Sequence, residues 1–156
     1  MDAATGVRVF ADDALPAQVK SDVALYLGRM WKTQVSVESG APPATGDAIW
    51  ISSSDDAKAR ARHASSTYSL ARNDDGGRKL LVAYAPAMND LVSATYALLE
   101  ELGARFFHPM QELIPELGAP FFPRALDAHR TAFSKVRGMQ PHVLHPLEYM
   151  PSLHQP

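Results

Sequence analysis

The chain has 156 residues, 46% of them hydrophobic and 21% charged, and its formal net charge is -2. This composition indicates one soluble globular domain, and the lack of any cysteine excludes a disulfide framework, a thiolate zinc site and a cysteine nucleophile. Balanced charge without basic runs argues against a nucleic-acid partner, and the longest apolar run, residues 79–86, is far shorter than the roughly 20 residues that span a bilayer.

The first half of the chain alternates between strand and helix patterns. Apolar side chains recur every three or four positions from Leu15 to Met30, which predicts a long amphipathic helix with Asp12 and Asp13 as capping candidates. Ser54 would cap a shorter helix in the same way. The predicted elements are a strand over 7–11, a helix over 14–31, strands over 33–37 and 48–52, and a short helix over 55–63.

The second half begins with a hairpin and a second long helix. Residues 73–77 are rich in Asp and Gly, which tolerate the positive φ of hairpin turns, and they separate strand patterns at 67–72 and 78–84. An apolar stripe over 89–102 predicts a helix, with Gly103 at its C-terminal end. The following stretch contains the strand- and helix-breaking residues Pro109, Pro115, Pro120 and Pro123.

This order of elements predicts an α+β fold in which a mixed sheet carries two long helices packed mainly on one face. The expected division is an α/β domain over 1–109, a proline-rich connector over 110–132, and the first strand and loop of a truncated catalytic barrel over 133–156.

A catalytic pair of carboxylates is not evident in the sequence. Most acidic residues that are close in sequence are direct neighbours, and neighbours on a helix or strand point in different directions. Glu112 and Glu116 have helical spacing, but Pro115 lies between them. The serines at 52–54 and His63 lack the Gly-x-Ser-x-Gly elbow of a nucleophile. We therefore predict no catalytic residue within this chain.

Other polar and aromatic groups indicate binding more than chemistry. His142, His145 and Glu148 are spaced three residues apart, and these residue types ligate metals or line sugar sites, but the order of a zinc-protease motif is absent, so we expect no metal. No glycine-rich phosphate loop is present, and no cofactor is expected. Trp31 and Trp50 could stack on sugars, although core packing is the commoner role.

Residues 79–107, which end in LLEELGARFF, resemble a segment of large glycoside hydrolases in which a strand and loop lead into a helix. The segment occurs in the N-terminal zincin-like α+β domain of family 20 β-N-acetylhexosaminidases and α-glucuronidases. The run FSKVRG at 133–138 is similar to the start of the first barrel strand in those enzymes. In the hexosaminidases an Asp and a sugar-binding Arg follow, where this chain has His142 and His145.

The resemblance implies a non-catalytic accessory domain that supports a downstream (β/α)8 barrel of the same polypeptide acting on a glycan. His142, His145 and Glu148 would then lie on the substrate side of the barrel. Phe106, Phe107, Phe121, Phe122 and Phe133 would either face that barrel or join the core. The first residues show no signal peptide, so the compartment stays open, and a periplasmic or secreted parent is compatible with the family.

Two alternatives use the same residues differently. The chain would be a free-standing carbohydrate- or protein-binding module if no hydrolase were attached to it. A small metalloenzyme built on His142 and His145 is the least favoured interpretation, because their spacing matches no known ligand geometry.

Overall fold

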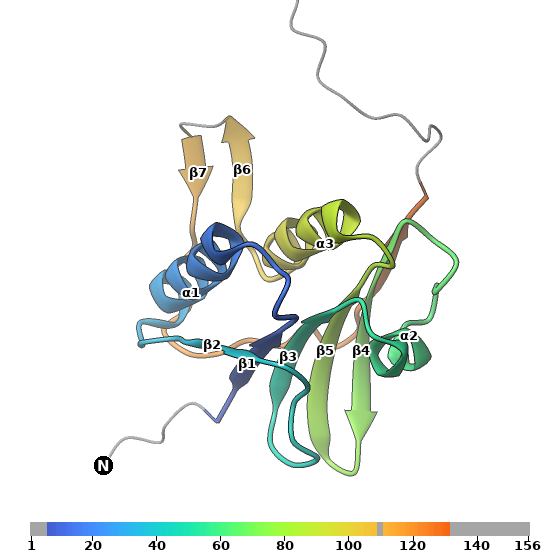
Figure 1. Ribbon diagram of the computed structural model, residues 1–156. Helices are drawn as coiled ribbons and strands as arrows, with labels where there is room; N and C mark the ends of the chain where they lie inside the picture. The colour runs from blue at the N-terminus through green and yellow to red at the C-terminus, as the bar shows by residue number, and fades with distance from the viewer. Residues whose placement is uncertain (1–5, 109–110, 132–156) are drawn as a thin grey trace, which may run out of the picture.

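The computed structural model describes residues 6–108 and 111–131. They form a mixed sheet of six strands, three helices and a small hairpin (Figure 1). The strands are β1 (Arg8–Ala11), β2 (Val37–Ser39), β3 (Ala48–Ser52), β4 (Tyr68–Asp75), β5 (Arg78–Tyr84), β6 (Arg105–His108), β7 (Gln111–Leu113) and β8 (Asp127–Arg130); the helices are α1 (Ala17–Trp31), α2 (Asp55–Arg60) and α3 (Met88–Glu101).

The large sheet has the strand order β2-β1-β3-β5-β4-β8. The first four strands in this order are parallel to one another, whereas β4 is antiparallel to both β5 and β8. The predicted hairpin of β4 and β5 is confirmed, and its turn contains Gly76 and Gly77, both with positive φ. Strand β8 pairs with only the first half of β4, over Tyr68–Ala71, and it forms one edge of the sheet.

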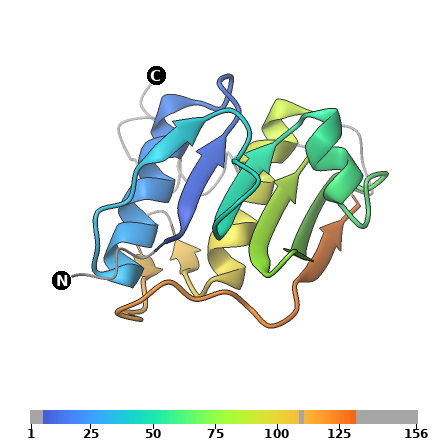
Figure 2. The same cartoon turned by 90° about the horizontal axis from the view of Figure 1, so that it is seen from below.

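The main core lies between the sheet and the two long helices. Figures 1 and 2 show α1 and α3 side by side on one face of the sheet, which confirms the prediction of two long helices on one face. Alternate residues of the central strands, such as Val9, Ile49 and Leu81, point to this side and are fully buried against Leu27 and Leu98 of the helices.

The opposite face carries the third helix. Strand residues of the other parity, including Phe10, Trp50 and Val82, form a smaller buried cluster with Ala57 of α2. Ser54 caps α2 as predicted, because its Oγ accepts the N–H of Ala57 at 3.3 Å. The sheet is therefore covered on both faces, but by two long helices on one side and by a single short helix on the other.

The start of α1 differs from the sequence prediction. Asp12 does not cap the helix; its carboxylate binds Ser52 and Ser53 instead, and α1 starts at Ala17 with Pro16 at the cap position. A turn in which the N–H of Leu15 donates to the oxygen of Asp12 occupies the intervening residues. Asp12 therefore binds serines about 40 positions away in the sequence instead of capping the helix that follows it.

The proline-rich stretch contains more regular structure than its composition predicts. Strands β6 and β7 pair as a hairpin, and β8 adds to the sheet within the segment expected to be a connector. Strand β2 also lies later than expected, at Val37–Ser39. Proline removes only its own N–H, and β7 and β8 fit between successive prolines. The division into domain, connector and barrel remains a prediction.

Candidate functional site

The best-defined hollow on the helical side is a groove of about 620 Å³ that runs between α1, α3 and the β6–β7 hairpin. We call it the tyrosine groove. Its aromatic part is formed by Tyr26, Tyr96 and Phe106, with ring centroids 5.3 Å apart for Tyr26 and Phe106 and 5.8 Å apart for Tyr96 and Phe106. Tyr68 of β4 and Arg130 of β8 line the groove at the edge of the sheet, and Ser93, Ala97 and the exposed Glu100 line it from α3.

Carboxylates within the groove hold the phenol groups in place. The Tyr96 hydroxyl donates to Asp22 at 2.5 Å, and Tyr26 is hydrogen-bonded to Glu112, which also pairs with Arg29. Burial, and then the hydrogen bond to Glu112, raises the pKa of Tyr26 to about 12. Burial and the bond to Asp22 likewise raise the pKa of Tyr96.

The same bonds act on Glu112. The hydrogen bond from Tyr26, followed by the one from Arg29, lowers the pKa of the Glu112 carboxyl. Glu112 therefore stays ionised near neutral pH as an acceptor for two donors. The groove presents aromatic faces together with two carboxylates, Asp22 and Glu112, that already have partners, an arrangement suited to binding a surface.

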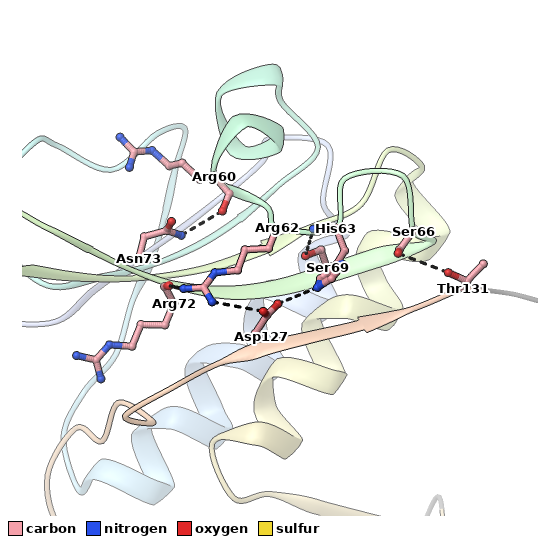
Figure 3. Close-up of polar contacts among 9 residues, drawn as sticks. All are labelled: Arg60, Arg62, His63, Ser66, Ser69, Arg72, Asn73, Asp127 and Thr131. Carbon is pink, nitrogen blue, oxygen red and sulfur yellow. Dashed lines mark hydrogen bonds and ion pairs between the residues drawn. The ribbon is translucent and has the colours of Figure 1, made fainter.

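A second polar cluster fixes the last described strand to the sheet (Figure 3). Asp127 of β8 accepts a bond from Arg62 Nη1 at 3.3 Å, and its Oδ1 lies 3.0 Å from Nε2 of His63. The ring of His63 stacks on that of His129, with centroids 3.8 Å apart, and Thr131 contacts Ser66. We call this set the β8 clamp, because the segment after α2 holds the edge strand.

The β8 clamp does not form a catalytic triad. Among the described residues, His63 bonds to serines of this cluster only through its backbone: its N–H donates to Ser69 Oγ at 3.4 Å, and its carbonyl oxygen accepts the N–H of Ser66 at 3.0 Å. Ser69 is fully buried, so its hydroxyl is not open to a substrate. A nucleophile needs its base at the hydroxyl itself, and that contact is not among those of the described residues.

A third cluster lies where the parallel strands β1 and β3 end. This is a topological switch point, since the chain leaves β1 toward one edge of the sheet and β3 toward the other. Asp12 accepts bonds from Ser52 Oγ at 2.6 Å and from the N–H and Oγ of Ser53 at 2.7 and 2.6 Å. Burial alone would raise the pKa of Asp12, but these bonds lower it below its ordinary value. Its acceptor capacity is used within the fold.

Several residues that the sequence offered as site candidates contribute to the fold through core packing, ion pairs or helix capping. Trp31 and Trp50 are buried, at 2% and 4% exposure, as expected for core residues. Glu112 and Glu116 do not form a carboxylate pair; each makes its own ion pair, with Arg29 and Lys32 respectively. The serines at 52–54 are separate from His63: they bind Asp12 and cap α2.

The phenylalanines expected either to face the barrel or to join the core differ in their exposure. Phe106 lines the tyrosine groove and Phe122 packs against the core, whereas Phe121 is 49% exposed. The side chains of Phe107 and Phe133 lie outside the described residues, as do His142, His145 and Glu148. The substrate-side assignment of those last three residues therefore remains a prediction.

Sequence reasoning missed the groove because its residues come from separate elements. Tyr26 and Asp22 have helical spacing on α1, which was a usable signal for one wall. Nothing local linked them to Tyr96 or Glu112, since those contacts depend on how the helices and the hairpin pack.

Residues 6–108 and 111–131 contain neither a metal-binding cluster nor a membrane-spanning helix. In this part of the chain, no three His, Asp or Glu side chains are grouped so that they could hold a metal ion. Each described helix is too short or too polar to traverse a lipid bilayer. No protein-family model matches the chain, and no curated protein is significantly similar to it.

Proposed function

We propose that this chain contains the non-catalytic N-terminal accessory domain of a glycoside hydrolase and supports a catalytic barrel later in the same polypeptide. The segment that resembles the hydrolase domains covers β5, α3 and β6. These elements include a central strand of the sheet and one wall of the tyrosine groove. The resemblance therefore falls on the region where we place the contact with the rest of the polypeptide.

The observation that carries the proposal is the position of the groove relative to β8. Arg130, the last residue of β8, lines the tyrosine groove, and the chain continues from Thr131. Whatever follows in the polypeptide thus begins at the rim of an aromatic, hydrogen-bonding hollow. Tyr, Phe and Arg are the residue types that are enriched in protein interfaces.

The β8 clamp supports the same function. It joins Asp127 and Thr131 to the segment after α2, so the point at which the chain leaves the sheet is fixed by side-chain bonds at both ends of the strand. A fixed exit limits the positions that a following domain can take. An accessory domain that supports a barrel needs such a restriction.

The direct test compares two lengths of polypeptide. The 156-residue chain and the longest open reading frame that contains it would both be assayed on a panel of chromogenic glycosides. We expect the longer polypeptide to hydrolyse at least one of them and the 156-residue chain to hydrolyse none. Turnover by the short chain, or by neither length, would contradict the proposal.

The groove can be tested within the longer polypeptide. The variant Tyr96→Ala removes an aromatic wall and the bond to Asp22, and we expect a lower melting temperature of the barrel with the catalytic residues untouched. Leu25→Ala is the matched control, because Leu25 is an exposed apolar residue that does not line the groove.

The role proposed for the C-terminal histidines has its own test. If His142, His145 and Glu148 lie on the substrate side of the barrel, replacing His145 with Ala in the longer enzyme changes turnover or the Michaelis constant. Unchanged values of both would remove these residues from the site and leave the accessory-domain proposal standing.

A free-standing carbohydrate- or protein-binding module is the second candidate. The exposed aromatic rings beside hydrogen-bonding groups in the tyrosine groove favour it, because sugars and protein surfaces both use such combinations. A stop codon directly after Pro156, together with saccharide binding and no turnover, would select this function over the first.

A further inference from the structure

The edge of the sheet beside α2 carries a concentration of arginine, of which the proposed function uses only Arg62. Strand β4 extends to Asp75, but β8 pairs with it only up to Ala71, so a notch of about 580 Å³ lies next to the open end of β4. Its eight lining residues include four arginines and one acid. We call it the arginine notch; its arginines are Arg60, Arg62, Arg72 and Arg124.

The arginines come from different elements and are held at the notch by the fold. Arg72 Nη1 donates to the oxygen of Pro123 at 2.6 Å, and Arg62 Nη2 donates to the oxygen of Arg72 at 3.2 Å. Asn73 Nδ2 donates to the oxygen of Arg60 at 3.2 Å. Figure 3 shows Arg60 and Arg72 extending on either side of Asn73.

Arg72 also forms a two-bond ion pair with Asp74, from Nε at 2.8 Å and from Nη2 at 3.1 Å. Donor capacity remains in the notch at Arg62 and Arg124. A guanidinium has five N–H donors, and Arg62 uses one bond from Nη1, to Asp127, and one from Nη2. Arg124 is exposed and has no ion pair within the described part of the chain. In a protein whose net charge is -2, four arginines around one hollow favour an anion.

An adjoining cavity of about 630 Å³ supplies a second, independent indication of a ligand. Arg60 lines both hollows, and the second one also contains Trp50 and Arg78. These two side chains are more than nine-tenths buried, yet Trp50 Nε1 and Arg78 Nε have no hydrogen-bond partner among the described residues. Buried donors without acceptors are costly, and oxygen atoms of a ligand would satisfy them.

We call this second hollow, which contains Trp50 and Arg78, the Trp50 cavity. We propose that the arginine notch and the Trp50 cavity together bind an acidic saccharide. Its carboxylate or sulfate ester contacts the arginines of the notch, and its neutral oxygens accept from Trp50 and Arg78. Each hollow has the volume of a typical small-molecule site. The saccharide part of this inference rests on the proposed glycan function, whereas the anionic part rests on the arginines alone.

The two tryptophans provide a direct readout in the 156-residue chain. The indole N–H signal of Trp50 would be followed by nuclear magnetic resonance while β-1,4-linked glucuronyl-glucose is added at constant ionic strength. Trp31 lines neither cavity and serves as an internal reference. Cellobiose, the uncharged analogue of this disaccharide, is the control ligand. We expect a saturable shift of Trp50 with the acidic disaccharide only, and no shift of Trp31.

Variants that each remove one positive charge test whether the disaccharide binds at the arginine notch. Arg124→Gln removes a positive charge without breaking a described hydrogen bond or ion pair, and we expect affinity to fall on the order of tenfold. Lys58→Gln is the matched control: it makes the same charge change on α2 at an exposed residue outside both cavities. Its affinity should stay within about twofold of the parent value.

Three results would overturn the inference: no response of Trp50, an equal response to cellobiose, or equal weakening by both variants. Binding of inorganic sulfate that depends on Arg124, without binding of the disaccharide, would overturn the saccharide assignment. These measurements need no catalysis. Hydrolysis by the longer polypeptide without saccharide binding here would therefore refute this inference alone, and the reverse result would refute the accessory-domain proposal alone.

Discussion

The tyrosine groove and the arginine notch belong to one small domain but treat their polar groups in opposite ways. In the groove, Asp22 and Glu112 already accept bonds from Tyr96 and Tyr26. In the notch, Asp74 and Pro123 hold Arg72, but Arg62 keeps unused donors and Arg124 has no ion pair within the described part of the chain. Polar groups that are already hydrogen-bonded within the protein suit a surface that another domain covers permanently. Donors without a partner in the protein suit a site for a ligand that binds and dissociates. The comparison separates a docking face from a binding site.

The largest expected effect concerns the two cores behind these sites. Leu81 and Leu80 are consecutive residues of β5; Leu81 packs against the long helices, whereas Leu80 points to the α2 side and lines the Trp50 cavity. We expect Leu81→Ala to lower the free energy of unfolding by about 3–5 kcal/mol and Leu80→Ala by about 2–3 kcal/mol, because the wall of an existing hollow loses fewer neighbours. Denaturant titration measures both. Equal losses would remove the distinction between the two cores.

The replacement of Asp12 is expected to have the next largest effect on the free energy of unfolding. It joins the ends of β1 and β3 through three bonds to Ser52 and Ser53. We expect Asp12→Ala to cost about 2 kcal/mol of unfolding free energy, since it removes the acceptor of the half-buried N–H and hydroxyl of Ser53. Asp13→Ala is the control, because Asp13 is exposed. A similar cost for both variants would contradict the assignment.

The pH dependence of this contribution has a definite sign. The pKa of Asp12 is lower in the folded chain than its ordinary value, so the carboxylate stabilises the fold above the ordinary pKa of about 3.9. That contribution is lost as the pH falls through the folded-state pKa. The parent should therefore lose stability below about pH 4 more steeply than Asp12→Ala does. Parallel acid denaturation curves would be inconsistent with this account.

Local patterns predicted most of the secondary structure and little of the sites. The stripes of α1 and α3 and the Asp-Gly turn between β4 and β5 are properties of neighbouring residues, and those elements were predicted correctly. The cap on α1 was wrong because Ser52 and Ser53, about 40 positions away, bind Asp12. The bonds from Tyr96 to Asp22 and from Arg29 to Glu112 in the groove, and the bonds that hold β8 in the clamp, have this long-range character. Periodicity carries no information about such pairs.

Tyrosine titration tests the internal satisfaction of the groove, with a smaller effect. The pKa of Tyr26 is raised to about 12 and that of Tyr96 is raised as well. Burial first, and then the hydrogen bonds to Glu112 and Asp22, favour the neutral phenols. The resulting stabilisation is present below the ordinary pKa of about 10 and is lost as the pH rises through the folded values. Absorbance at alkaline pH should show Tyr26 and Tyr96 ionising late, and Tyr26→Phe should remove one late signal at a cost of about 1 kcal/mol. Loss of neither late signal would contradict the bond to Glu112.

The β8 clamp gives the smallest expected effect and tests whether the chain's exit is fixed. Asp127 is exposed, so Asp127→Asn should change global stability by less than about 1 kcal/mol. The change should instead be local. Amide hydrogens that join β4 to β8, including the N–H of Arg72 that donates to Leu126, should exchange faster, while those between β3 and β5 keep their rates.

Asp13→Asn is the control for this variant, because it makes the same chemical change at an exposed residue far along the sheet order from β8. If Asp127→Asn leaves exchange along β8 unchanged, the bonds from Arg62 and His63 do not hold the edge strand. The direction in which the chain leaves the sheet would then depend on the backbone pairing of β4 and β8 alone, and an accessory domain would have to fix its partner through the tyrosine groove instead.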